Sequence, residues 1–206
     1  MKEIERVIFP FQEIEFFTPI RGKIQYARVV VLATRQLLLN SECDGIEVNS
    51  KMKLIVDKMS RLFFYKEQKY FSVSFPFSIT CADNEVLEVT TYSGKILDNK
   101  NISAIISILD NEQFKITRSL IDIFIEPDSI ESSGVFILEE IFQFEPSYVR
   151  YDYDPENENG KLHPLHHLDI NYSQNSTFKL GLDTTITPNN FENLHNISTD
   201  CLFIKD

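Results

Sequence analysis

Apolar positions recur at helical spacing in the first third of the chain. Within residues 50–65, four apolar side chains lie three or four positions apart: Met52, Ile55, Met59 and Leu62. Ser50 precedes them, and serine is a preferred residue at a helix N-terminus. Residues 25–39 are apolar on nearly all sides, which predicts a second, more buried helix, although residues 29–32 also suit a strand. The pattern therefore predicts that residues 1–69 are mainly helical.

After residue 70 the pattern changes to alternation of apolar and polar positions. Four apolar side chains alternate with two serines and a proline: Phe71, Val73, Phe75 and Phe77. A period of two is typical of a strand, and Pro76 indicates an edge strand or a bulge because proline cannot donate to a sheet ladder. Residues 85–95 predict the next strand, with its turn at Ser93 and Gly94.

The second half continues this arrangement. Residues 102–114 predict a short helix, and residues 116–127 and 135–146 predict two strands around a loop. The fold class expected from these segments is α+β, with N-terminal helices packed on a mainly antiparallel β-sheet. Because no Gly/Ser linker divides the 206 residues, we expect a single domain, mainly helical over residues 1–69 and mainly sheet over residues 70–206.

Residues 148–172 hold a concentration of titratable side chains. Three of the four histidines lie there within five positions, after an Arg-Tyr-Asp-Tyr-Asp run. Two strands are predicted around a turn rich in Asn, Glu and Gly. Alternation puts Arg150 and Asp152 on one face of the first strand, and His167 and Asp169 on one face of the second. We therefore expect a hairpin that brings these four side chains together.

The remaining histidines have different expected places. His163 lies just before Pro164 and is expected at the mouth of the hairpin, whereas His166 falls on the opposite, apolar face and is expected to pack there. His195 is isolated and is expected to cap or pack. A structural interpretation also exists for the whole cluster, because histidines serve as interior hydrogen-bonding residues and an Arg–Asp pair across a hairpin can fix its register.

The cluster has the residue types of an acid–base site. Imidazole titrates near neutral pH, so His163 and His167 could divide the roles of general acid and general base. Asp152 and Asp169 could orient them, and Arg150 could bind a phosphate through two hydrogen bonds. Cleavage of RNA by its own 2′-hydroxyl needs such groups and no attacking side chain, so RNA is a candidate substrate.

The same residues could instead hold a divalent metal ion. A mixed nitrogen and oxygen ligand set suits zinc, manganese or magnesium in a hydrolytic site. The candidate ligands are Asp152, His163, His167 and Asp169, with Asp154 adjacent. The sequence leaves metal-free and metal-dependent chemistry open.

Composition limits the partners. A net charge of −11 is unfavourable for binding along a duplex, because such binding depends on Lys and Arg contacts to phosphate. Cys43, Cys81 and Cys201 have no metal or disulfide spacing, which is typical of a reducing cytoplasm. Acidic residues near the N-terminus are atypical of a signal peptide, and no window approaches the ~18 apolar residues of a membrane span. We therefore expect a cytoplasmic protein without a membrane association.

Three motifs resemble a known group of proteins. They are "YVRYDYDP" from Tyr148, "HPLHHLDI" from His163 and "TPNNF" from Thr187. Their order is similar to that in a family of uncharacterised bacterial proteins with the pattern R-Y-D, H-P-x-x-H-L-H and P-x-x-F, over roughly the second half of the chain. This chain departs from the pattern at Asp169, where the family has histidine, and the departure favours a metal or structural role. A looser resemblance is to small bacterial ribonuclease toxins.

Two functions from different classes follow. The first is a hydrolase or nuclease-like effector of a bacterial defence or toxin system that acts through Arg150, Asp152, His163, His167 and Asp169. The second is a non-catalytic subunit that binds a larger protein or a second copy of the chain through an apolar, acidic surface. The histidine cluster favours the first, and the net charge of −11 favours the second.

Overall fold

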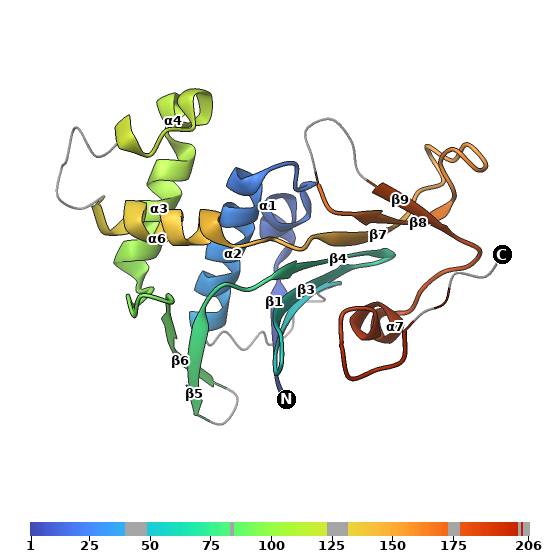
Figure 1. Cartoon of the computed structure of the whole chain (residues 1–206), viewed down its shortest axis with the longest axis horizontal. Helices are drawn as coiled ribbons and strands as arrows, with labels where there is room; N and C mark the ends of the chain where they lie inside the picture. Colours follow the sequence, from blue (N-terminus) through green and yellow to red (C-terminus); the bar gives the residue numbers. More distant parts are fainter. Residues whose placement is uncertain (40–48, 83–84, 123–131, 173–177, 202, 204–206) are drawn as a thin grey trace. The chain divides into compact units, whose positions relative to one another are not determined.

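The computed structural model describes residues 1–39, 49–82, 85–122, 132–172, 178–201 and 203 (Figure 1). The chain forms two compact units, and each is assembled from separate stretches of sequence. Unit 1 comprises Met1–Glu13, Ile46–Ser74 and Ser147–Asp206, and unit 2 comprises Ile14–Gly45 and Phe75–Pro146. Among the described residues, no helix combines the length and the apolar character needed to cross a bilayer.

The described part of unit 1 contains a seven-stranded sheet in which all neighbouring strands are antiparallel. The strands, in their order across the sheet, are β1 (Lys2–Ile8), β2 (Ser50–Val56), β3 (Ser60–Lys66), β4 (Lys69–Ser74), β7 (Val149–Tyr153), β8 (His166–Ile170) and β9 (Phe178–Leu182). A short 3-10 helix, η1 (Pro10–Gln12), follows β1, and a helix, α7 (Pro188–Asn193), follows β9. Thr187 caps α7 by accepting a hydrogen bond from the Asn190 backbone N–H.

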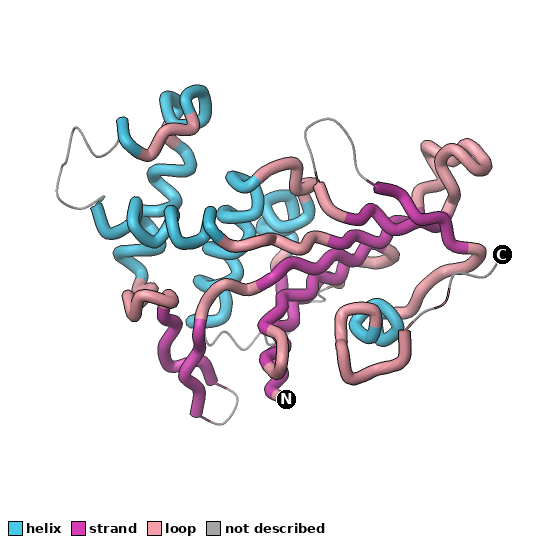
Figure 2. The backbone as a smooth tube through the Cα atoms, viewed as in Figure 1, coloured by secondary structure: helices cyan, strands magenta, loops and turns pink. Residues whose placement is uncertain are grey.

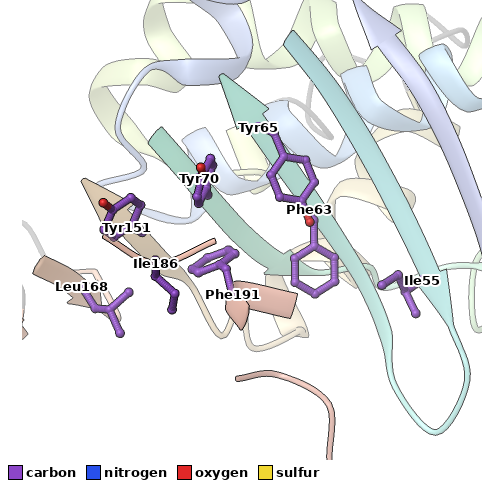
Figure 3. Close-up of a cluster of buried hydrophobic side chains, with 8 residues drawn as sticks. All are labelled: Ile55, Phe63, Tyr65, Tyr70, Tyr151, Leu168, Ile186 and Phe191. Atoms are coloured by element: carbon purple, nitrogen blue, oxygen red, sulfur yellow. The ribbon is translucent and has the colours of Figure 1, made fainter. Parts of the chain in front are cut away.

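One face of this sheet is buried beneath the C-terminal segment. The buried cluster contains eight side chains: Ile55, Phe63, Tyr65, Tyr70, Tyr151, Leu168, Ile186 and Phe191 (Figure 3). Phe191, from α7, meets Phe63 edge to face with ring centroids 6.2 Å apart. His195 packs against the same two rings, at 5.5 Å from Phe63 and 5.0 Å from Phe191. This buried face of the sheet therefore anchors the C-terminal segment.

His195 is expected to make the folded state sensitive to acid. Burial, reinforced by the charge of Arg61, lowers the pKa of His195 to about 4, from 6.5. Its stabilising contribution is fully present above pH 6.5 and is lost as the pH falls towards 4, a change of about 3 kcal/mol. A His195→Gln variant should remove this part of the pH dependence when urea unfolding is compared between pH 7 and pH 4.5. An unchanged dependence in the variant would show that other groups cause it.

Unit 2 contains helices and a two-stranded hairpin (Figure 2). Its described helices are α1 (Glu13–Phe17), α2 (Lys23–Leu38), α3 (Asn99–Asp110), α4 (Glu112–Thr117) and α6 (Ser132–Gln143). The first residue of α1, Glu13, is also the last residue of the first stretch of unit 1. The hairpin consists of β5 (Ser78–Ala82) and β6 (Glu85–Thr90). Gly134 lets α6 lie close to α3, because a Cβ there would be 3.0 Å from the Cβ of Ala104.

Several expected elements are confirmed. The fold is α+β with an antiparallel sheet. The buried helix α2 forms where the sequence predicts it, and the single helix predicted over residues 102–114 forms as two helices, α3 and α4. Strand β6 ends in a turn with Gly94 at φ 82°. The alternating segment after residue 70 forms β4 and β5, and it breaks around Pro76 because the chain leaves the first sheet there.

The helix predicted over residues 50–65 is wrong, since this segment forms β2 and β3. Its turn is closed by a 2.8 Å hydrogen bond from the Asp57 N–H to the Met59 carbonyl. Both faces of β3 are buried, so its sequence lacks the polar alternation of a half-exposed strand. The chain also opens with strand β1 rather than with a helix. The expected boundary near residue 69 therefore does not separate helices from strands.

The strand predicted over residues 135–146 is also wrong. Residues 135–143 belong to α6, whose buried residues recur at helical spacing: Gly134, Val135, Ile137, Leu138 and Ile141. Its Phe and Ile residues favour strands locally, but the periodicity of the buried positions decides the structure. The strand predicted over residues 116–127 is wrong at its first two residues, because residues 116 and 117 form the end of α4. Residues 123–127 lie outside the described residues.

Candidate functional site

The last three strands of unit 1 place the candidate residues on one face of the sheet. In the β7–β8 hairpin, Arg150 pairs with Asp169 and Asp152 pairs with His167, as the alternation predicts. Strand β9 adds Lys179 opposite Asp169. Residues opposite each other in an antiparallel pair point to the same face, so the five side chains gather there. Figure 1 shows β7, β8 and β9 side by side.

Arg150 holds the two carboxylates together. Its Nη2 lies 2.6 Å from Asp152 Oδ2 and 2.6 Å from Asp169 Oδ2. The carboxylates are almost fully buried, with 5% of Asp152 and 2% of Asp169 exposed. Burial tends to lower the pKa of Arg150, but Tyr148 and the two carboxylates outweigh it and raise that pKa. The guanidinium therefore stays charged and compensates the buried negative charge.

Lys179 supplies a second positive charge to the cluster. Its Nζ lies 2.9 Å from Asp169 Oδ1 and 2.9 Å from His167 Nε2. Burial tends to raise the pKa of Asp169, but the hydrogen bond from Lys179 and the charges of Arg150 and Lys179 lower it below its ordinary value. The sequence pattern did not indicate Lys179 as a member of the site. Alternation in "FKLGL" could have put it on a polar face, but only the register of β8 with β9 puts it opposite Asp169.

The hydrogen bonds of His167 define its tautomer. Its Nδ1 lies 2.8 Å from the Pro164 carbonyl oxygen, which can only accept, so Nδ1 carries the proton. Nε2 is then the acceptor of a hydrogen bond from the Lys179 ammonium. Gly181 keeps Pro164 close, because a Cβ on Gly181 would lie 2.9 Å from Pro164 Cγ. Since His167 is only 1% exposed, these contacts fix its ring in place.

His163 lies above this buried cluster and is the more accessible imidazole. Its ring centroid is 4.7 Å from that of His167, and its side chain is 26% exposed. Its Nε2 lies 3.1 Å from Asp154 Oδ2, which accepts the hydrogen bond. This contact orients the ring and leaves Nδ1 as the proton acceptor when the ring is neutral.

Asp154 is held in position by its own hydrogen bonds. Burial tends to raise the pKa of Asp154, but hydrogen bonds from Asn157 and His163 lower it below its ordinary value. The Asn157 side chain reaches its two carboxylate oxygens at 3.0 and 3.1 Å. Asp154, which the sequence offered only as an adjacent metal ligand, is therefore the partner of His163.

Three of the four expected metal ligands come together. Donor atoms of Asp152, His167 and Asp169 lie within 4.8 Å of one another, which suits a divalent ion. His163 is not part of this group and pairs with Asp154 instead. The same three donors contact Arg150 and Lys179, so the positive charge they need is already supplied by side chains.

His166 lies on the opposite side of β8 from this cluster. Its Nδ1 is 2.9 Å from the Tyr151 hydroxyl, which is also 2.9 Å from Thr185 Oγ1. Its ring stacks on that of Tyr151 with an interplanar angle of 5°. These contacts belong to the packed face, where the sequence places this histidine.

Comparisons of the chain with protein-family models, curated proteins and solved structures give no match. The resemblance carried by the R-Y-D and H-P-x-x-H motifs stays a prediction. The chemistry of the side chains is therefore the only indication of function.

Proposed function

We propose that the chain is a metal-independent ribonuclease that cleaves RNA through the RNA's own 2′-hydroxyl. The proposal rests on one observation: the accessible His163–Asp154 pair lies directly over a Lys179–His167–Asp169 chain. This arrangement puts a proton acceptor, His163, and a cation, Lys179, next to the same ring, that of His167. The resemblance to ribonuclease toxins suggests an effector of a bacterial defence or toxin system.

The proposed reaction needs one base, one acid and a positive charge. His163 Nδ1 takes the proton of the 2′-hydroxyl, and the 2′-oxygen attacks the phosphorus. The bond from phosphorus to the 5′-oxygen breaks, and the 5′-oxygen takes a proton from the Lys179 ammonium. The products are a 2′,3′-cyclic phosphate and a 5′-hydroxyl. Exchange with water returns a proton to Lys179 and removes the one on His163.

Lys179 is better suited than Arg150 to contact the phosphate. Its side chain is 31% exposed, against 18% for that of Arg150, whose Nη2 is occupied by two carboxylates. Arg150 and Lys179 together balance Asp152 and Asp169, so the cluster carries no net charge. A neutral cluster can admit a phosphate within a chain of net charge −11. His167 acts through Lys179, which it positions.

The experiment is a cleavage assay on a short labelled RNA in excess chelator. We expect products ending in a 2′,3′-cyclic phosphate. A matched oligonucleotide with a single 2′-deoxy sugar should remain intact at that position, since the attacking oxygen is absent. Cleavage of the deoxy substrate, or complete loss of cleavage in chelator, would contradict a metal-free 2′-hydroxyl mechanism.

An open groove in unit 2 favours a second candidate function, which is protein binding. The groove has a volume of about 740 Å³ and lies between the outer face of α6 and the turn after β6. Phe136 and Phe144 are 44% and 39% exposed along it, and Glu139 and Glu145 add negative charge. The Lys95 ammonium lies 4.6 Å from the Phe136 ring centre, so a cation already contacts the aromatic lining of the groove. Because aromatic rings and carboxylates both attract cations, the groove suits a partner segment that presents Lys or Arg. A chain that is inert on RNA would favour this non-catalytic role.

A further inference from the structure

Lys179 contacts two of the three residues whose donor atoms could hold a divalent metal ion. Its Nζ is 2.9 Å from both His167 Nε2 and Asp169 Oδ1. Together with Asp152, these two residues form the group whose donor atoms lie within 4.8 Å of one another. The tautomer of His167 directs the Nε2 lone pair at the ammonium, which is the orientation that a metal ligand requires.

The ammonium and a metal ion cannot share this position. Two carboxylates face two cations in the cluster, so their charges balance. A divalent ion bound beside Lys179 and Arg150 would add two charges to a site that is already neutral. It would also compete with Lys179 for the same donor atoms of His167 and Asp169. Coordination therefore requires that Lys179 leave its place.

We propose that Lys179 is the built-in cation of this site and excludes a divalent ion that its three donor residues would otherwise bind. Removal of the amine then opens a zinc site with one nitrogen and two carboxylate ligands, from His167, Asp152 and Asp169. Such a three-residue set leaves a coordination position for water. The inference names the cation of the proposed site, but it rests on side-chain geometry and does not require RNA to be the substrate.

Zinc titration of matched variants tests the proposal. In Lys179→Leu, which offers no ligand atom, we expect one zinc ion to bind at least 100-fold more tightly than to the wild-type chain in calorimetry. Thermal unfolding of this variant should shift upwards with zinc. Lys179→Arg keeps the positive charge and should behave like the wild-type chain. The double variant Lys179→Leu/Asp169→Asn lacks one carboxylate ligand and should lose the gain.

Each outcome decides the question. If Lys179→Leu does not fold alone, recovery of its circular dichroism spectrum by zinc supports the proposal, and a failure of zinc to restore it counts against it. Equal zinc affinity in Lys179→Leu and the wild-type chain would overturn the proposal. Zinc binding by the wild-type chain that is lost in the single variant Asp169→Asn would also overturn it. RNA cleavage is measured separately. If the wild-type chain does not cleave RNA but the variants bind zinc as expected, the ribonuclease proposal is wrong and the proposal that Lys179 is the built-in cation stands.

Discussion

Replacement of Asp169 by alanine is expected to lower the free energy of unfolding by about 3–5 kcal/mol, the usual cost of removing one partner of a buried ion pair. Asp169 is 2% exposed and accepts from both Arg150 and Lys179. Its loss leaves two cations next to a single buried carboxylate, that of Asp152. Urea unfolding followed by circular dichroism measures the change.

Two controls separate this effect from a general loss of packing. The double variant Asp169→Ala/Lys179→Leu removes both members of one pair and should be less destabilised than the single variant, because no unpaired ammonium remains. Asp154→Ala removes a partly exposed carboxylate and should cost less than about 1 kcal/mol. A cost for Asp169→Ala as small as that for Asp154→Ala would mean that water, rather than Asp169, compensates the two cations.

The pH dependence provides a further check on Asp169. Its pKa is lower in the folded chain than its ordinary value, so its contribution to stability is present above the ordinary pKa. That contribution is lost as the pH falls through the lowered pKa. The Asp169→Ala variant should lack this acid-dependent part of its stability.

The hairpin at residues 148–172 could be predicted because its local pattern agrees with its surroundings. Alternation on either side of a polar turn assigns Arg150, Asp152, His167 and Asp169 to one face, and β7 and β8 pair in that register. A hairpin is a local structure, so the sequence on its two sides determines which residues meet. The neighbouring strand β4, by contrast, comes from far earlier in the chain.

The incorrect segments and the missed lysine depend on contacts between distant parts of the chain. Strand β3 is buried on both faces, which removes the polar alternation that identifies a strand, whereas β2 keeps that alternation from Ser50 to Leu54. Lys179 stands alone in an unremarkable segment, and only its register with β8 puts it next to Asp169 and His167. Local periodicity contains neither kind of information.

Burial changes which histidine carries the proposed chemistry. The sequence offers His163 and His167 as equal candidates, but His167 is 1% exposed and both of its nitrogens have partners. A variant at His167 would disturb the buried cluster and could not distinguish activity from folding. His163 is accessible, and its single orienting partner is Asp154, so it provides the cleaner test.

Replacement of His163 by alanine is accordingly expected to reduce RNA cleavage by about 100- to 10,000-fold, the usual contribution of a general base. The free energy of unfolding should change by less than about 1 kcal/mol, because the side chain lies at the rim of the cluster. Cleavage rates and urea unfolding are measured on the same preparation.

His166→Gln is the matched control, since it changes a histidine three positions away on the packed face and should retain activity. Asp154→Ala should reduce cleavage less than His163→Ala does, because the imidazole remains and loses only the carboxylate that orients its ring and stabilises its charged form. Full activity in His163→Ala would exclude it as the base. Equal losses in His163→Ala and His166→Gln, accompanied by unfolding, would instead assign both histidines to the structure of the hairpin, because a general base can be removed without loss of the fold.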